Sequence, residues 1–197
     1  MLIMPNDGSP YASILSIDPG TETLGIACVE FDVERLVIHG SEAKTFKGSK
    51  LAVEWVEELH GGRFSRIHGH CRNLTRILNV VDPAYIACES PFFSRAHPQA
   101  YGALTEIVYA LRLAVFEHNP LLEIQYIDPP SVKNAVGAKG NADKFAVRDC
   151  VLRLADLNYA GKIPLAALDE HSIDSLAVGY AYFQMIVALM KAGWHRG

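Results

Sequence analysis

The sequence predicts an α/β protein in which helices flank a mixed sheet of five strands. Short apolar or alternating runs indicate the strands, and longer stretches with apolar residues three or four positions apart indicate the helices. The order of these elements is three strands, a helix, a strand, a helix, a strand and further helices. A hairpin that leads into alternating helices and strands is typical of a mixed sheet, because parallel strands need long crossover connections.

The first part of the chain supplies three strands. Residues 13–18 and 24–31 are apolar runs separated by the turn-rich sequence DPGTET, which predicts a hairpin. A third strand is expected at about 34–46. Residues 50–80 have helical periodicity that Gly61-Gly62 interrupts, so either two helices or one kinked helix is expected there.

The second part of the chain alternates helices with short strands. Asp82-Pro83 ends the long helical region, and the strands expected after it cover residues 85–89 and 124–127. The helices expected in this part cover about 99–118, 131–136, 142–157 and 171–191, with a loop at 158–169. Residues 1–197 read as one domain in which 1–12 form a flexible N-terminal extension.

Composition restricts the classes of function. The 197 residues carry a formal net charge of −4, so contact with nucleic acid has to come from local basic segments and metal ions. The four cysteines lack paired spacing, which disfavours zinc and disulfides and favours a reducing cytoplasm. Residues 1–12 lack the apolar core of a signal peptide, and residues 175–190 read as a buried core helix that does not span a membrane.

Four separated residues predict the chemistry. Asp18 and Glu89 each end an apolar strand, while His171 and Asp174 are three positions apart and share one face of a helix. Oxygen ligands of this kind suit Mg²⁺, which keeps coordination positions open for phosphate. Two such ions can stabilise the attacking and the leaving oxygen of a phosphodiester. The pattern therefore favours a metal-dependent nuclease.

Four segments, in order, resemble the RuvC-type Holliday junction resolvases. They are IDPGTETLG at 17–25, ACESPFF at 87–93, SVKNAVGAKGNADKFAVRDCV at 131–151 and HSIDSLAVGYA at 171–181. The resemblance spans roughly residues 13–185. It implies a ribonuclease-H-like fold, a homodimer, and symmetric nicking of two strands at a four-way DNA junction.

The resemblance also implies the catalytic and metal-binding set, which is Asp18, Glu89, His171 and Asp174. Many members have aspartate at the position of His171, and some relatives use histidine. Asp169 or Glu170 is the alternative fourth ligand. The implied cofactor is Mg²⁺, two ions per active site, with Mn²⁺ as a substitute.

Basic and aromatic residues around this set are candidates for contacts to DNA. Lys133, Lys139 and Lys144, with Arg148, either contact phosphate or form a solvated helix face. A second basic group is equally open between a DNA flank and a solvated surface: Arg63, Arg66, His68, His70, Arg72 and Arg76. By the resemblance Phe92 enters an opened junction, and the alternative is an ordinary core role for one of Phe92 and Phe93. Arg95, at the expected mouth of the site, is a candidate for contact with a phosphate.

Some features depart from the family pattern. The helix at about 99–118, the dimer interface by analogy, lacks a second glycine, and the loop around 60–70 is longer than usual. These departures suggest a divergent, phage-type member acting in a host cytoplasm. The alternatives are a nuclease on branched DNA more generally, a non-catalytic junction-binding module, and an ATPase of the same broad fold.

Overall fold

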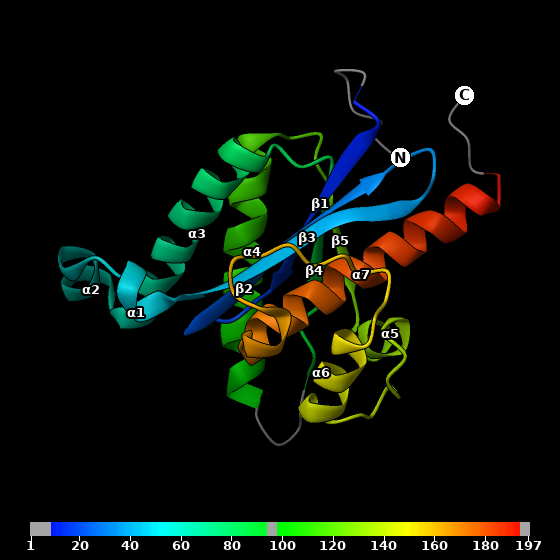
Figure 1. The fold of residues 1–197 in the computed structure, drawn as a ribbon. Helices are drawn as coiled ribbons and strands as arrows, with labels where there is room; N and C mark the ends of the chain where they lie inside the picture. The colour runs from blue at the N-terminus through cyan, green and yellow to red at the C-terminus, as the bar shows by residue number, and fades with distance from the viewer. Residues whose placement is uncertain (1–8, 94–97, 194–197) are drawn as a thin grey trace.

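A five-stranded sheet separates two helical layers in the computed structural model, which describes residues 9–93 and 98–193 (Figure 1). The strands lie in the order β3-β2-β1-β4-β5. Their bounds are β1 (Tyr11–Asp18), β2 (Thr23–Asp32), β3 (Val37–Lys47), β4 (Tyr85–Glu89) and β5 (Ile124–Ile127). β1, β2 and β3 form an antiparallel meander, and β4 and β5 run parallel to β1. The mixed five-stranded sheet predicted from the sequence is confirmed.

Helices cover both faces of the sheet. One layer contains α1 (Gly48–Leu51), α2 (Glu54–His60), α3 (Gly62–Val81) and α4 (Pro98–His118). The other contains α5 (Pro129–Ala135), α6 (Lys144–Leu152) and α7 (Glu170–Lys191), with a short 3₁₀ turn at Leu165–Ala167. The last three helices all begin after an aspartate whose carboxylate accepts a backbone N–H of the first turn: Asp128, Asp143 and Asp169.

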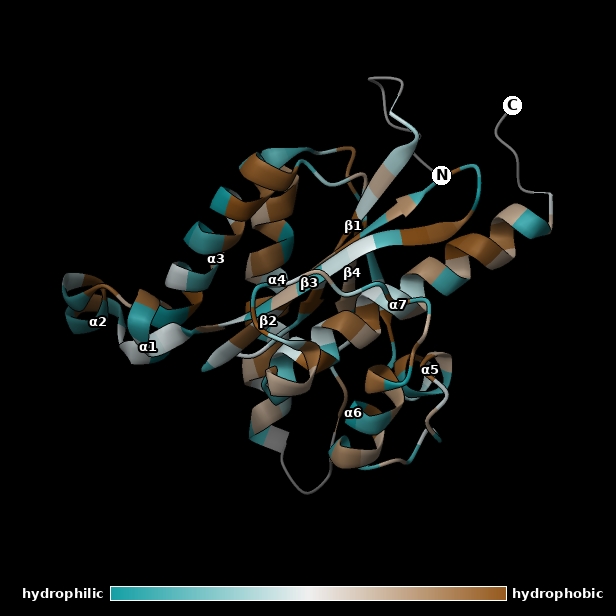
Figure 2. Cartoon of the chain, viewed as in Figure 1, coloured by the Kyte–Doolittle hydropathy of each residue, from teal (hydrophilic) through white to brown (hydrophobic). Residues whose placement is uncertain are grey.

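Alternation along the strands divides the core into two apolar layers. Ile14 on β1 faces α7, while its neighbour Leu15 faces α3 and α4. The hydrophobic segments in Figure 2 concentrate in the strands and along α7. Helix α7 is long and apolar enough to cross a membrane by length and composition, but most of its apolar stretch is buried against the sheet. It is the core helix that the sequence predicts.

Several boundaries differ from the sequence predictions. Strand β3 begins at Val37 and not at 34, because Leu36 adopts a left-handed conformation (φ 55°) that closes the turn after β2. Gly61, with φ 84°, separates α2 from α3, so this region contains separate helices and not one kinked helix. Tyr11 belongs to β1, which shortens the predicted flexible extension of residues 1–12, whose first eight residues lie outside the described part. Helix α6 ends at Leu152, five residues before the predicted end at 157.

Candidate active site

Two of the predicted carboxylates lie next to each other at the carboxyl edge of the sheet. Asp18 is the last residue of β1 and Glu89 is the last residue of β4. The two strands are parallel neighbours, with Ile17 opposite Cys88 one position earlier. Adjacent strands lie about 4.8 Å apart, so the next residues along, Asp18 and Glu89, leave the sheet side by side. A crevice beyond such strand ends is the usual location of a functional site in an α/β sheet.

Helix α7 brings the third carboxylate, Asp174, to the same edge. The Ser16 hydroxyl donates to the backbone carbonyl of Ser175 at 2.8 Å, which fastens the start of α7 onto β1. Gly25, opposite Asp18 on β2, makes this approach possible. A Cβ at Gly25 would overlap the backbone carbonyl of His171, so only glycine fits beneath the first turn of α7.

The pKa values show that the three carboxylates act on one another. Burial, then the charges of Asp18 and Asp174, raise the pKa of Glu89 to about 8. Burial and the charge of Asp18 raise the pKa of Asp174 to about 6. Lys133 and Lys144 oppose both shifts. Glu89 is therefore largely protonated at neutral pH until a positive charge arrives.

His171 pairs with Asp18. Its Nδ1 lies 2.8 Å from Asp18 Oδ2, and its Nε2 lies 2.7 Å from Thr23 Oγ1. The hydrogen bond to Asp18 is the main cause that raises the pKa of His171. Both ring nitrogens thus have partners, so ligation of a metal by His171 would require either Nδ1 to give up Asp18 or Nε2 to give up Thr23. As arranged, His171 orients the Asp18 carboxylate.

The alternative fourth ligands have other partners. Asp169 caps α7 by accepting the backbone N–H of Ser172 at 3.0 Å, and it also accepts the hydroxyl of Thr45. Glu170 forms an ion pair with Lys144. Of the three acidic or imidazole side chains at the start of α7, only His171 has a hydrogen bond to Asp18 in the described part of the chain.

The residues present suit a hard divalent cation, although their side chains do not already stand in a metal-coordinating arrangement. The charge of Asp18 raises the pKa of both Glu89 and Asp174, so a cation that neutralises this charge would relieve the repulsion, and carboxylate oxygens are the ligands that Mg²⁺ prefers. Among residues 9–93 and 98–193, however, no three His, Cys, Asp or Glu side chains already stand in an arrangement that could hold a metal ion. The metal-binding role of Asp18, Glu89, His171 and Asp174 stays a prediction.

Two of the predicted DNA-contacting lysines lie within electrostatic reach of the carboxylates. Lys133 and Lys144 both lower the pKa of Glu89 and of Asp174. Lys133, on α5, donates from its Nζ to the carbonyl of Ala142 at 2.7 Å, and this bond ties α5 to the loop before α6. Lys139 is exposed in the turn after α5.

Arg148, grouped with these lysines in the sequence analysis, has a structural role. Its guanidinium donates to the carbonyls of Leu168, at 2.7 Å, and Ala166. The interaction ties α6 to the segment that leads into α7. These two bonds use two of the five N–H donors of the guanidinium, and the contact of Arg148 with phosphate stays a prediction.

The aromatic pair after β4 is exposed. Phe92 is 63% and Phe93 is 54% exposed, so neither packs in the core. The ring of Phe93 contacts Tyr101 edge-on, with centroids 5.6 Å apart, whereas Phe92 has no ring partner among the described residues. Arg95 lies outside the described residues, and its predicted phosphate contact stays a prediction.

The second basic group predicted from the sequence is partly used inside the protein. Arg63 pairs with Glu106 at 3.0 Å, and Arg66 pairs with Glu22 at 2.7 Å. His70 is fully buried, and its Nε2 lies 3.3 Å from the carbonyl of Thr21. The contacts of Arg66 and His70 support the β1–β2 turn that follows Asp18, whereas the Arg63 pair joins α3 to α4. For Arg72 and Arg76 the two alternatives stay open.

Sequence reasoning missed three residues that shape the site. Thr23 holds His171, Gly25 admits the first turn of α7, and Ser16 anchors that turn. Thr23 and Gly25 lie in the TETLG segment that follows Asp18, whose turn chemistry was noticed while its contact with α7 was not. The buried serine in a strand of apolar residues was the available signal for Ser16.

Comparison with known proteins agrees with this geometry. Residues 14–182 match the family model described as crossover junction endodeoxyribonuclease RuvC. A protein of that name from Synechococcus sp. (strain RCC307) is 29% identical over 177 residues, which cover 87% of this chain and 98% of the relative. A second, from Haemophilus ducreyi, is 29% identical and covers 93% and 95% of the two chains.

Solved structures share the fold. Thermus thermophilus RuvC in complex with Holliday junction substrate has a TM-score of 0.66 at 21% identity, covering 90% of this chain and 96% of that one. The yeast mitochondrial Holliday junction resolvase Ydc2 has a TM-score of 0.64 at 14% identity, covering 94% and 86%. The ribonuclease-H-like fold predicted from the sequence is confirmed by these resolvases.

Proposed function

Because the chain belongs to the crossover junction endodeoxyribonuclease RuvC family, we propose that it is a nuclease that resolves four-way DNA junctions by hydrolysing phosphodiester bonds. The observation that carries this proposal is the convergence of Asp18, Glu89 and Asp174 at one edge of the sheet. Three acidic groups from distant segments meet at this edge, where burial and neighbouring charge raise the pKa of Glu89 and Asp174, and such an arrangement is costly for stability. Such a cost is typical of a catalytic site.

The proposed cofactor is Mg²⁺, two ions per active site, with Mn²⁺ as a substitute. Asp18, Glu89 and Asp174 would hold the metal, and His171 is the proposed fourth residue. Bound cations supply activation of a water and neutralisation of the leaving oxygen. Glu89 has to lose its proton before it can serve as a ligand, because its pKa of about 8 keeps it largely protonated at neutral pH.

The lysines beside the carboxylates would receive the DNA backbone. Lys133 and Lys144 lie close enough to Glu89 and Asp174 to lower the pKa of both carboxyl groups. A phosphate placed at that edge would therefore be attracted by these two lysines. Lys139, exposed in the preceding turn, would contact a neighbouring phosphate. Such contacts position DNA without reading its sequence.

The exposed ring of Phe92 is the proposed junction wedge. It follows Glu89 by three residues and is 63% exposed, so it can reach DNA held at the carboxyl edge. An apolar ring of this kind can separate stacked bases. Phe93, which contacts Tyr101, would support the segment.

Two copies of the chain would place two active sites on one junction. Helix α4 exposes Tyr109, Leu113 and Phe116, at 63%, 44% and 60%. Their spacing puts the three side chains on one face of the helix. We propose that this face is the homodimer interface, because an exposed apolar stripe is typical of a surface that another protein covers.

Cleavage of synthetic DNA tests the function. With Mg²⁺, the protein should introduce paired, symmetric nicks into a four-way junction, and it should leave a linear duplex of the same sequence intact. Equal cleavage of flaps and three-way branches would favour a nuclease for branched DNA in general. Tight junction binding without cleavage in Mg²⁺ or Mn²⁺ would favour the non-catalytic module, and ATP hydrolysis without nicking would favour the ATPase.

A further inference from the structure

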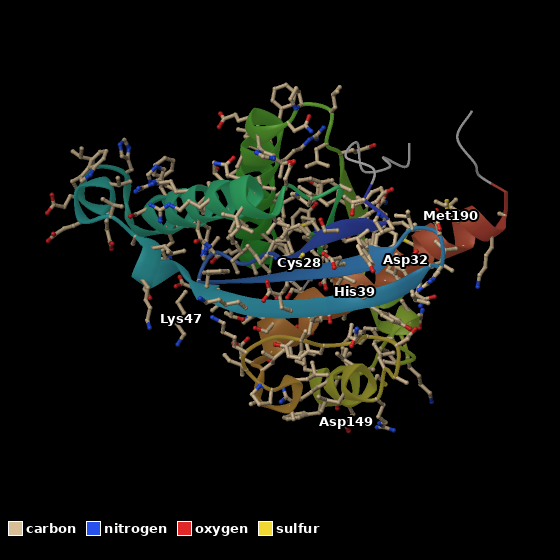
Figure 3. All side chains as sticks on the ribbon, turned by 45° about the horizontal axis from the view of Figure 1, so that its top comes forward. Cys28, Asp32, His39, Lys47, Asp149 and Met190 are labelled. Atoms are coloured by element: carbon tan, nitrogen blue, oxygen red, sulfur yellow. The ribbon has the colours of Figure 1, made fainter. Side chains whose placement is uncertain are left out.

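A groove of about 600 Å³ lies between α3 and the β1–β3 part of the sheet, away from the carboxylates. Figure 3 shows this part of the sheet from the side of β3, with Cys28 labelled. Cavities of a few hundred cubic ångströms are typical of sites for small molecules. Nothing in the proposed nuclease mechanism uses this one.

The floor of the groove follows from strand register. Leu15, Cys28 and Glu42 are paired across β1, β2 and β3, so their side chains share one face of the sheet, as do Ile26 and Lys44 one row along. On the opposite face α7 packs directly across the same strands. On this face α3 leaves a gap over β2 and β3, which creates the groove.

The lips of the groove are apolar and exposed. Val80 on α3 is 85% exposed, and Ile163 on the loop opposite is 53% exposed. The loop is fixed to the edge of β3, because Ala160 N–H donates to the Ser41 carbonyl at 2.8 Å and Ser41 N–H donates to the Asn158 carbonyl at 3.0 Å. A preformed site loses little entropy when it closes on a ligand.

Charge on the rim selects the ligand. Lys44, Arg76 and Lys162 line the groove with a single acidic partner, Glu42. None of the three basic side chains forms an ion pair in the described part of the chain. Lys44 instead lies 5.3 Å from the ring centre of Phe46. The residues that line the groove therefore carry more positive than negative charge, with Glu42 as the single carboxylate among them.

We propose that this groove binds a small apolar anion, with its ring or chain on Leu15, Ile26 and Ile77 and its acidic group near Lys44 and Arg76. The apolar walls would exclude water from the ligand, and the cations would hold its charge at the rim. Such a ligand would occupy a site distinct from the carboxyl edge.

Fluorescence of 1-anilinonaphthalene-8-sulfonate, an apolar aromatic anion, tests the proposal on the full-length protein. We expect saturable binding that sodium decanoate displaces. The double variant Lys44→Glu, Arg76→Glu should weaken binding by about tenfold or more, because it turns two attractive contacts into repulsive ones. Val80→Asp replaces a side chain that is 85% exposed, so it should leave the fold intact, and it should weaken binding as well.

Matched controls separate the groove from other apolar surfaces. Leu121→Ser removes an exposed apolar side chain between α4 and β5, and Lys191→Glu reverses a charge at the far end of α7; both should leave the affinity unchanged. Bound decanoate should also slow alkylation of Cys28 by N-ethylmaleimide at pH 8.5, while Cys150, outside the groove, reacts at the same rate. Binding that survives the rim variants but disappears in Leu121→Ser, or no saturable binding, would overturn the proposal.

Discussion

The first turn of helix α7 and the apolar stretch further along it lie in opposite environments. Its first turn places His171 and Asp174 among other charged groups, where burial and like charge raise the pKa of Asp174 to about 6. Three turns further on, Phe183 is 3% exposed and packs against Phe31 with ring centroids 5.4 Å apart. The apolar part of the helix stabilises the fold, and this stability allows its first turn to keep a costly arrangement of charges.

The largest expected effect comes from replacing the carboxyl group of Glu89, which ends β4 beside the first turn of α7. Glu89→Gln keeps the shape of the side chain but cannot give up a proton to become a carboxylate ligand. Cleavage of a four-way junction should fall by about a thousandfold or more, which corresponds to the loss of a central catalytic group. Quantitative gel assays with Mg²⁺ measure the rate.

The same variant should unfold at a higher temperature than the natural protein at pH 8. Junction affinity measured in Ca²⁺ should change little. Normal cleavage by Glu89→Gln would remove Glu89 from the active site.

Truncating an apolar side chain further along α7 should reduce stability. Phe183→Ala leaves a cavity between α7 and the sheet and should lower the free energy of unfolding by about 3–5 kcal/mol. Urea denaturation measures the loss. Met185→Ala, a change at a 40% exposed position of the same helix, is the matched control and should cost far less. Similar losses for the two variants would show that α7 is not the buried support described above.

His171→Ala tests the hydrogen bond between His171 on α7 and Asp18 at the end of β1. Asp18 loses its partner at 2.8 Å, so cleavage should fall by roughly ten- to a hundredfold while junction affinity is retained. His171→Asp should recover part of the activity if a carboxylate can serve at this position. His60→Ala, on exposed α2, controls for loss of an imidazole. Turnover near normal in His171→Ala would transfer the fourth position to Glu170.

The smallest effect concerns stability against pH. The folded protein binds a proton at Glu89 more tightly than the unfolded chain does, because its pKa rises from 4.5 to about 8. The unfolding free energy in the absence of divalent metal should therefore fall as pH rises through this range. Thermal melts should show a decline of a few degrees that Glu89→Gln reduces. A stability that rises over the same range would contradict the shift.

The apolar end of α7 was predictable from sequence, whereas the details of its first turn were not. Periodicity fixed the strands that end at Asp18 and Glu89, because alternation and burial are local signals. The i, i+3 spacing of His171 and Asp174 predicted one shared face. The contact of His171 with Thr23 and the fit of α7 over Gly25 depend on tertiary packing between segments some 150 residues apart. The structural contacts of Arg148 were not predictable for the same reason, since only the fold brings the Leu168 carbonyl to it.

Binding of Mn²⁺ measured by electron paramagnetic resonance tests most directly whether the carboxyl edge is a metal site. The free Mn²⁺ signal should fall on addition of protein, more strongly at pH 8.5 than at pH 6.5, because Glu89 with its pKa of about 8 has to lose a proton first. Asp18→Asn should abolish the binding, and Glu89→Gln should remove its pH dependence. Mn²⁺ binding that is the same in all three proteins and at both pH values would contradict the account.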